Sequence, residues 1–217
     1  MFTRRGVVLS ALAAATAGPA LAQPPAKMRL SWPSFRASPD YQPYRAAIAR
    51  MRANRNAADP DSWLYWANVH ERYCPHHKAW FLAWHRGLLH LFERKLAELS
   101  GVPDLRLPYW DYYADPLLPA EFVAGGPDNP LWADRVGRSV AAALTLEPFG
   151  PAHLNFQEGL PGSFELALEF QPHNPVHNLI GGVMVTMQSP QDPIFWLHHA
   201  NVDRLWTAWA AAGEGRP

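Results

Sequence analysis

The strongest periodic pattern of apolar residues in the chain covers residues 79–99. Inward positions recur there every three to four residues, which is the spacing of one face of an α-helix. The members of this stripe are Phe81, His85, Leu88, Leu89, Phe92 and Leu96. Because His85 belongs to the stripe, the pattern predicts a helix that carries one histidine into the core.

Weaker patterns of the same kind predict the other helices. One runs from Tyr41 to about Asn54, and another begins after Asp61 or Ser62, either of which can cap it. Residues 163–181 and 192–212 supply two more helical segments, whereas 100–160 predict irregular connection with a short helix near 131–144. We therefore expect a mostly α fold, a four-helix bundle core with long irregular loops, which can hold metal between inward side chains.

The first 40 residues follow a different pattern. Residues 1–22 combine the Arg4-Arg5 pair, an apolar run and the sequence Ala20-Leu21-Ala22, which is typical of a cleaved export signal and not of a membrane span. The arginine pair favours the twin-arginine route over an ordinary secretory signal. Residues 23–40 are rich in proline and predict an extended N-terminal arm, which leaves 41–217 as one domain.

Charge and cysteine content restrict the function further. The chain has 19 basic and 19 acidic residues, and loss of Arg4 and Arg5 with the signal leaves 17 against 19, a net charge of −2. This balance gives no reason to expect a nucleic-acid partner, or a membrane partner after signal removal. Cys74 is the single cysteine, so no intramolecular disulfide can form.

All ten histidines lie between positions 70 and 199. His173 and His177 are four residues apart, so a helix would place both rings on one face. Pro175 fits between them if this helix begins near residue 174, because proline is tolerated in a first turn. The pair alone is weak support for a metal site and needs further ligands.

Other histidines supply such ligands. His70 and His76 precede the inward His85, and the three can converge on one ion. His199 precedes Asp203 by one helical turn and offers a ligand to a second triad. For His77, His90, His153 and His198 we keep the alternative of a core histidine that bonds a carbonyl, and His198 becomes a supporting or rim group.

Two triads of neutral imidazoles also indicate which metal is bound. Iron pairs in helical bundles use glutamate ligands, and a zinc pair with six imidazoles would be unusual. Imidazole suits copper, which we take as the expected metal.

The sequence around these histidines resembles the common central domain of tyrosinases, catechol oxidases and molluscan-type haemocyanins. The matching motifs are HHKAWFLAWHR, the His173 and His177 pair, and DPIFWLHHANVDRLW, and the resemblance spans residues 41–212. It implies a type 3 dicopper centre with two copper ions as cofactors. The implied ligands are His70, His76 and His85 for copper A, and His173, His177 and His199 for copper B.

The resemblance implies roles for neighbouring residues as well. Cys74 is expected to form a thioether with His76, the alternative being a buried free cysteine. A water that takes the proton of a phenol is expected to be held by Glu169 and Asn174, with Glu165 as the alternate acid. In the alternative, both glutamates are helix residues without a role in the chemistry. The remaining implied positions are Asp203 behind the ligands and Thr186 and Met187 over the substrate entrance.

The implied activity is that of an exported copper oxidase, periplasmic or extracellular, which uses O2 to oxidise small phenols or o-diphenols to o-quinones. A copper-delivery partner is compatible with this function. One alternative is a haemocyanin-like dioxygen carrier without turnover, and another is a zinc-loaded or metal-free relative. Because the chain stops 18 residues after His199, it is expected to be either a minimal form with an open entrance or a fragment.

Overall fold

The computed structural model describes residues 27–213, so the predicted export signal over 1–22 lies outside the described residues. Within 27–213 the fold is helical, and the β-structure described there consists of isolated bridges. The α-helices are α1 (Trp32–Arg36), α2 (Tyr41–Ala53), α3 (Trp63–Tyr73), α4 (Phe81–Ser100), α5 (Ala120–Val123), α6 (Phe164–Leu168), α7 (Asn174–Ile180) and α8 (Ile194–Ala212). The mostly α fold predicted from the sequence is thus confirmed.

Short helical turns connect these elements. The 3-10 turns are η1 (Gly126–Asp128), η2 (Ala141–Ala143), η3 (Glu147–Phe149), η5 (Gly182–Val185) and η6 (Ser189–Gln191), and η4 (Glu169–His173) is a π-helical turn. The short helix predicted near 131–144 is therefore reduced to the single turn η2. The helix predicted over 163–181 is divided into α6, η4 and α7.

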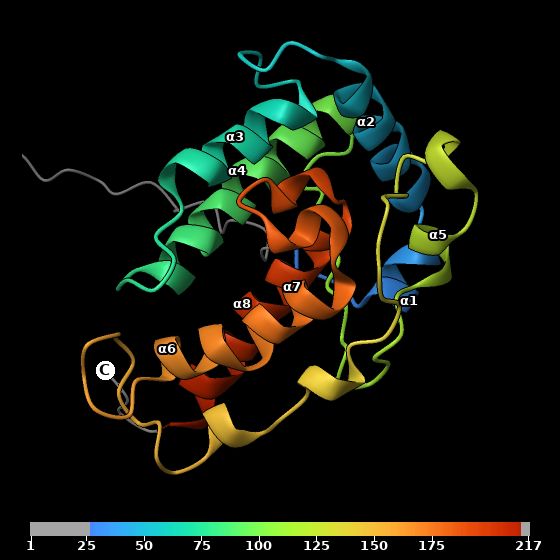
Figure 1. Cartoon of the computed structure of the whole chain (residues 1–217). Helices are drawn as coiled ribbons and strands as arrows, with labels where there is room; N and C mark the ends of the chain where they lie inside the picture. Colours follow the sequence, from blue (N-terminus) through green and yellow to red (C-terminus); the bar gives the residue numbers. More distant parts are fainter. Residues whose placement is uncertain (1–26, 214–217) are drawn as a thin grey trace, which may run out of the picture.

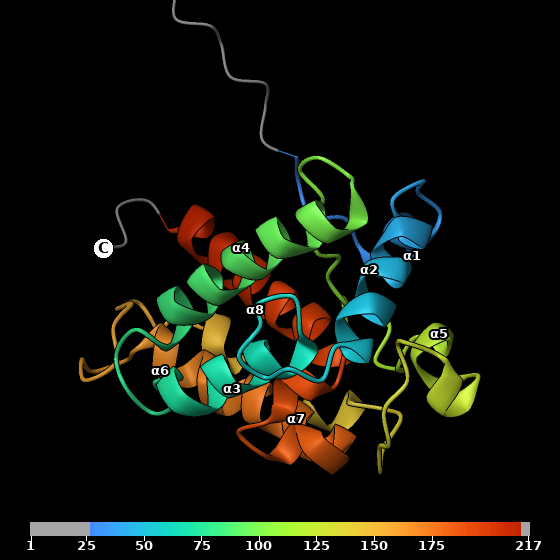
Figure 2. The same ribbon diagram turned by 90° about the horizontal axis from the view of Figure 1, so that it is seen from above.

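The core forms where α4 packs against α8. Figure 1 shows α2, α3 and α4 in one half of the molecule and α6, α7 and α8 in the other, and Figure 2 shows α4 crossing α8. The predicted stripe of α4 is buried, and every residue of α8 from Ile194 to Val202 is buried as well. Phe92 of α4 stacks on Trp196 of α8 with ring centroids 3.5 Å apart. Because this part of α8 is buried on all sides, its sequence lacks the one-sided apolar pattern of a surface helix.

Local sequence explains where the helices begin and end. Ser62 caps α3, since its side chain accepts a hydrogen bond from the Leu64 N–H at 3.2 Å. Gly101 ends α4 in the left-handed conformation that glycine adopts without strain. Pro175 lies in the first turn of α7, as the sequence predicted, because an N–H there has no helical partner.

The prediction of an extended arm over residues 23–40 is wrong for residues 32–36. These residues form α1, and Trp32 and Phe35 are buried in the core. The Trp32 N–H donates to the Tyr109 carbonyl, and the Tyr109 N–H donates to the Leu30 carbonyl. Two backbone hydrogen bonds to Tyr109 therefore hold this part of the arm against the rest of the domain. Burial of two aromatic side chains outweighs the tendency of this proline-rich segment to stay extended.

Candidate metal centre

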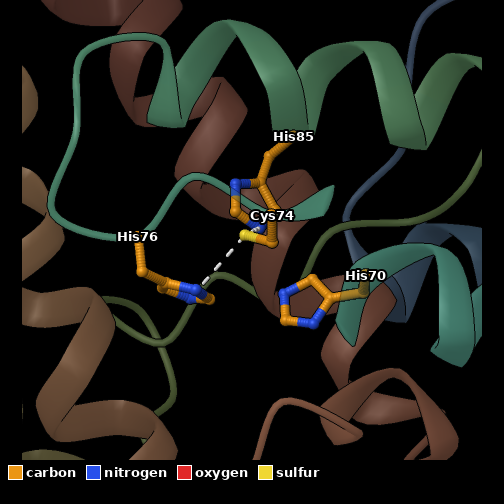
Figure 3. A group of neighbouring side chains, drawn as sticks. All are labelled: His70, Cys74, His76 and His85. Carbon is orange, nitrogen blue, oxygen red and sulfur yellow. Dashed lines mark hydrogen bonds between the residues drawn. The ribbon is translucent and has the colours of Figure 1, made fainter. Parts of the chain in front are cut away.

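The first group of histidines comes from two helices and the loop between them. His70 lies near the end of α3, Cys74 and His76 lie in the connecting loop, and His85 lies in the first turns of α4. One ligand atom from each of these four residues lies within 4.8 Å of the others. Figure 3 shows the four side chains gathered around one point, and we call them cluster A.

Two rings of cluster A are oriented by main-chain carbonyls. His70 Nδ1 lies 2.7 Å from the Met187 carbonyl oxygen, and His85 Nδ1 lies 2.9 Å from the Phe81 carbonyl oxygen. A carbonyl only accepts, so both Nδ1 atoms carry the proton and both Nε2 atoms present a lone pair. His70 Nε2 is buried and has no hydrogen-bond partner among the described residues. A hydrogen bond from one ring nitrogen to a carbonyl, with the other nitrogen left to bind an ion, is typical of metal-binding histidines.

Cys74 lies between two of these rings. Its Sγ is 3.9 Å from His76 Nε2 and 3.5 Å from His85 Nε2, and it is a free thiol. Burial raises the pKa of the Cys74 thiol, which keeps it protonated in the metal-free protein. The sulfur is thus close to His76, as the thioether prediction requires, but it is closer still to His85.

The second group, cluster B, comes from the other half of the molecule. It consists of His173 at the end of η4, His177 on α7, and His198 and His199 on α8, and its ligand atoms also lie within 4.8 Å of one another. His177 Nδ1 donates to the Met184 carbonyl at 2.7 Å, which leaves its Nε2 3.4 Å from His199 Nε2. Two imidazole nitrogens held about 2.0–2.1 Å from one ion in tetrahedral geometry have about this separation.

His198 is not at the rim of the site, one of the two places that the sequence suggested for it. The ring is fully buried, and it stacks on His173 with centroids 5.2 Å apart. Neither of its nitrogens has a partner among the described residues, so the expected bond to a carbonyl is not found. His198 therefore offers cluster B a fourth nitrogen beside the three that the resemblance implies.

The two clusters face each other across the core. The rings of His85 and His199 are stacked with centroids 4.1 Å apart, and the rings of His76 and His173 are 6.1 Å apart. Each pair takes one histidine from cluster A and one from cluster B. The donor set therefore fits two adjacent ions in a nitrogen-rich pocket, and imidazole nitrogen is a donor that suits copper.

Burial sets the charge of these rings. Loss of solvation lowers the pKa of His70 and of His177 to about 4, from an ordinary value near 6.5. The same cause lowers the pKa of His76, and it places the pKa of His85, His173, His198 and His199 well below that value. Both clusters are thus neutral near pH 7, the form in which imidazole binds metal.

The two acidic candidates differ in what they contact. Glu165 accepts the Leu82 N–H at 3.0 Å with one oxygen and the Glu158 N–H at 3.2 Å with the other, so both its oxygens hold main chain. Glu169 accepts the His77 N–H at 2.9 Å with Oε1, whereas its buried Oε2 has no partner among the described residues. Burial raises the pKa of Glu169. Of the two carboxylates, only that of Glu169 thus has an oxygen without a partner among the described residues.

The other predicted residues lie around the clusters. Asn174 contacts His173, with Oδ1 2.9 Å from Nδ1 of that ring. Asp203 bonds Arg86 at 2.5 Å and Arg29 at 2.6 Å, so it joins α8 to α4 and to the N-terminal arm and contacts no ligand ring directly in any described bond. This arrangement fits the expectation of a supporting role.

A cavity of about 450 Å³ opens beside both clusters, and we call it the entrance cavity. Thr186 and Met187 line it, together with Asn174 and Asn178 of α7. Sequence reasoning assigned Met187 to the entrance but could not foresee that its carbonyl orients His70. Main-chain carbonyls carry no residue signature, so the roles of Met184, Met187 and Phe81 have no signal in the sequence.

Comparison with known proteins supports the resemblance to tyrosinases that the sequence motifs indicate. The family model described as the common central domain of tyrosinase matches residues 48–134 and 134–212. A tyrosinase of Hahella sp. is 30% identical over 241 residues, with 80% of this chain and 52% of that protein covered. The tyrosinase of Streptomyces glaucescens is 33% identical over 185 residues, with 64% of this chain and 65% of that protein covered.

Solved structures agree on the fold. The polyphenol oxidase of Vitis vinifera superposes with a TM-score of 0.71 at 24% identity, over 87% of this chain and 72% of that chain. No helix within residues 27–213 is both long and apolar enough to cross a membrane. The chain spans about half to two thirds of the curated tyrosinases named above, and it belongs to the tyrosinase common central domain family.

Proposed function

We propose that the protein is a type 3 copper oxidase that uses O2 to convert small phenols or o-diphenols to o-quinones. The observation that supports this most strongly is the pairing of clusters A and B, two groups of buried neutral histidines in ring contact. His70, His76 and His85 would hold one copper ion, and His173, His177 and His199 the other. The bound copper pair would supply the binding and two-electron reduction of O2.

The protein itself handles the substrate and its proton. A phenol that enters through the entrance cavity reaches the face of cluster B, where Asn174 lies beside His173. Its hydroxyl proton passes to the free Oε2 of Glu169, directly or through a water held between Glu169 and Asn174. The raised pKa of Glu169 favours this role, because a carboxylate whose pKa lies closer to the working pH is a better proton acceptor.

The test of the oxidase function is copper content together with oxygen uptake. The purified chain is expected to bind two copper ions and to consume O2 with tyrosol or 4-methylcatechol. His199→Ala should lose one copper and all uptake, whereas His90→Ala, on the exposed face of α4, should retain both. Two coppers without turnover would favour the carrier alternative, and full activity of His199→Ala would refute the ligand set.

We further propose the thioether between Cys74 and His76. Joining Sγ to a ring carbon breaks the S–H bond and one ring C–H bond and releases two protons and two electrons, which O2 would take up to give H2O2 when copper is bound. The copper-treated protein should then be two hydrogens lighter than the metal-free protein. Mass spectrometry of the cross-linked peptide distinguishes His76 from His85, whose ring is also near the sulfur.

Export by the twin-arginine route belongs to the same proposal. A reporter fused to the first 22 residues should reach the periplasm or the medium, and replacing Arg4 and Arg5 by lysine should stop it. If export continued unchanged, an ordinary secretory signal would explain the segment better. Copper loading without any added protein would show that a copper-delivery partner is not required.

A further inference from the structure

The entrance cavity carries a feature that the proposed chemistry does not use. Its lining joins four imidazoles to the amides Asn174 and Asn178, the segment Met184–Met187, and Ser189. None of these described lining residues is Lys, Arg, Asp or Glu. A substrate on its way to the clusters therefore passes neutral side chains.

Two borders of this cavity are apolar or aromatic. The ring of His77 contacts that of Phe170 in a tilted arrangement with centroids 5.2 Å apart, and 49% of Phe170 is exposed although it is a large apolar residue. On another border, Val185 is 55% exposed and Met187 is 37% exposed. Exposed apolar side chains gathered around a cavity indicate contact with an apolar part of a ligand.

Among the described residues that line the entrance cavity there is no cationic side chain. Glu71 accepts a hydrogen bond from Gln188 at 2.5 Å, and Glu169 lies buried below His77. Lys78 follows His77 in the chain but does not line the cavity. A carboxylate that rests among these lining side chains, away from the clusters, would lose water without gaining an ionic partner from them.

We propose that this cavity selects phenols and catechols with an uncharged para substituent and discriminates against those that carry a carboxylate there. The inference rests on the proposed oxidase function and adds the substrate class. The neutral substituent packs against Val185 and Met187, while the reacting ring reaches cluster B past Asn174.

The matched probes are hydroxytyrosol and 3,4-dihydroxyphenylacetate, which differ only in a terminal CH2OH or carboxylate. With the copper-loaded full chain at about pH 8, above the usual range of histidine titration, kcat/KM should favour hydroxytyrosol by at least about tenfold, which is about 1.4 kcal/mol. The difference should appear mainly in KM, because the substituent is remote from the reacting oxygens. A ratio near one would overturn the inference.

Variants at the cavity test its cause. Val185→Arg introduces a cation at the border and should raise kcat/KM for the carboxylate and lower the ratio, whereas Val185→Gln, which is polar but neutral, should not raise kcat/KM for the carboxylate. Lys78→Ala should leave the ratio unchanged, and a marked change would show that Lys78 controls selection and that the cavity lining does not. If both catechols and 4-methylcatechol failed in a chain holding two coppers, the oxidase function itself would be refuted along with this inference.

Discussion

The metal-free protein should become unstable as the pH falls through the range in which free histidine titrates. Burial lowers the pKa of His70 and of His177 in the folded chain to about 4, whereas both rings titrate near 6.5 in the unfolded chain. Between about pH 4 and 6.5 the unfolded state therefore binds protons that the folded state does not bind. Stability is fully present above about pH 6.5 and is lost as the pH falls toward 4.

The size of this loss follows from the two shifts. The pKa of each ring is lower by about 2.5 in the folded chain. At about 1.36 kcal/mol for a pKa difference of one, each ring contributes up to about 3 kcal/mol to the free energy of unfolding. Together they approach the free energy of unfolding of a typical domain, about 5–15 kcal/mol. Metal-free protein should therefore unfold in mild acid, and bound copper should delay this because a ligated nitrogen cannot take a proton.

Urea unfolding followed by far-ultraviolet circular dichroism measures the effect, at about pH 8, 6 and 5 on chelator-treated protein. His177→Asn should reduce the pH dependence by nearly one proton, while His90→Gln, on the exposed face of α4, should leave it unchanged. Carboxylates contribute equally to all three proteins and cancel in the comparison. A free energy of unfolding that stayed constant from pH 8 to 5 would refute the claim that burial keeps the clusters neutral.

The remaining predictions concern the scaffold, and chemical unfolding checks each of them. Arg29→Met should cost about 2–4 kcal/mol, because the buried Glu93 then keeps only the Leu107 N–H and the more distant Arg106 as partners; Arg94→Met, exposed on α4, should cost little, and equal costs would contradict this account. Gly137→Ala should cost about 1–3 kcal/mol, since an added Cβ would lie 2.0 Å from the Leu179 carbonyl oxygen. Gly87→Ala, with open space around it inside α4, should instead stabilise by about 0.5–1 kcal/mol, and a loss there would refute the reasoning.

The sequence predicted those features that repeat with a helical period. The stripe of α4 and the inward position of His85 followed from spacing alone, and the start of α7 followed from Pro175. These features depend on local sequence, which is visible without the fold. Spacing along the chain also indicated two possible histidine triads. That the two triads lie against each other depends on helices far apart in the chain, and only the resemblance to a known family indicated this in advance.

Features governed by tertiary packing could not be predicted. The burial of Trp32 and Phe35 depends on partners that arrive later in the chain, so the arm was expected to be extended. The resemblance already preferred Glu169 to Glu165, but which main-chain N–H groups face each carboxylate is visible only in the fold. The burial of His198 likewise follows from α8 being surrounded, which its composition permits but does not require.

The short segment 182–187 holds one ring from each cluster. The carbonyl of Met184 orients His177, and the carbonyl of Met187, three residues later, orients His70. An ion that fixes either ring also fixes this segment and so prepares the other cluster. We expect copper to load cooperatively: a calorimetric titration of the metal-free chain should show a tighter second ion, and two independent affinities would contradict the coupling. Because main-chain carbonyls accept both bonds, replacing the side chain of Met184 or Met187 does not remove them, and the two halves of the centre are held by one segment of backbone.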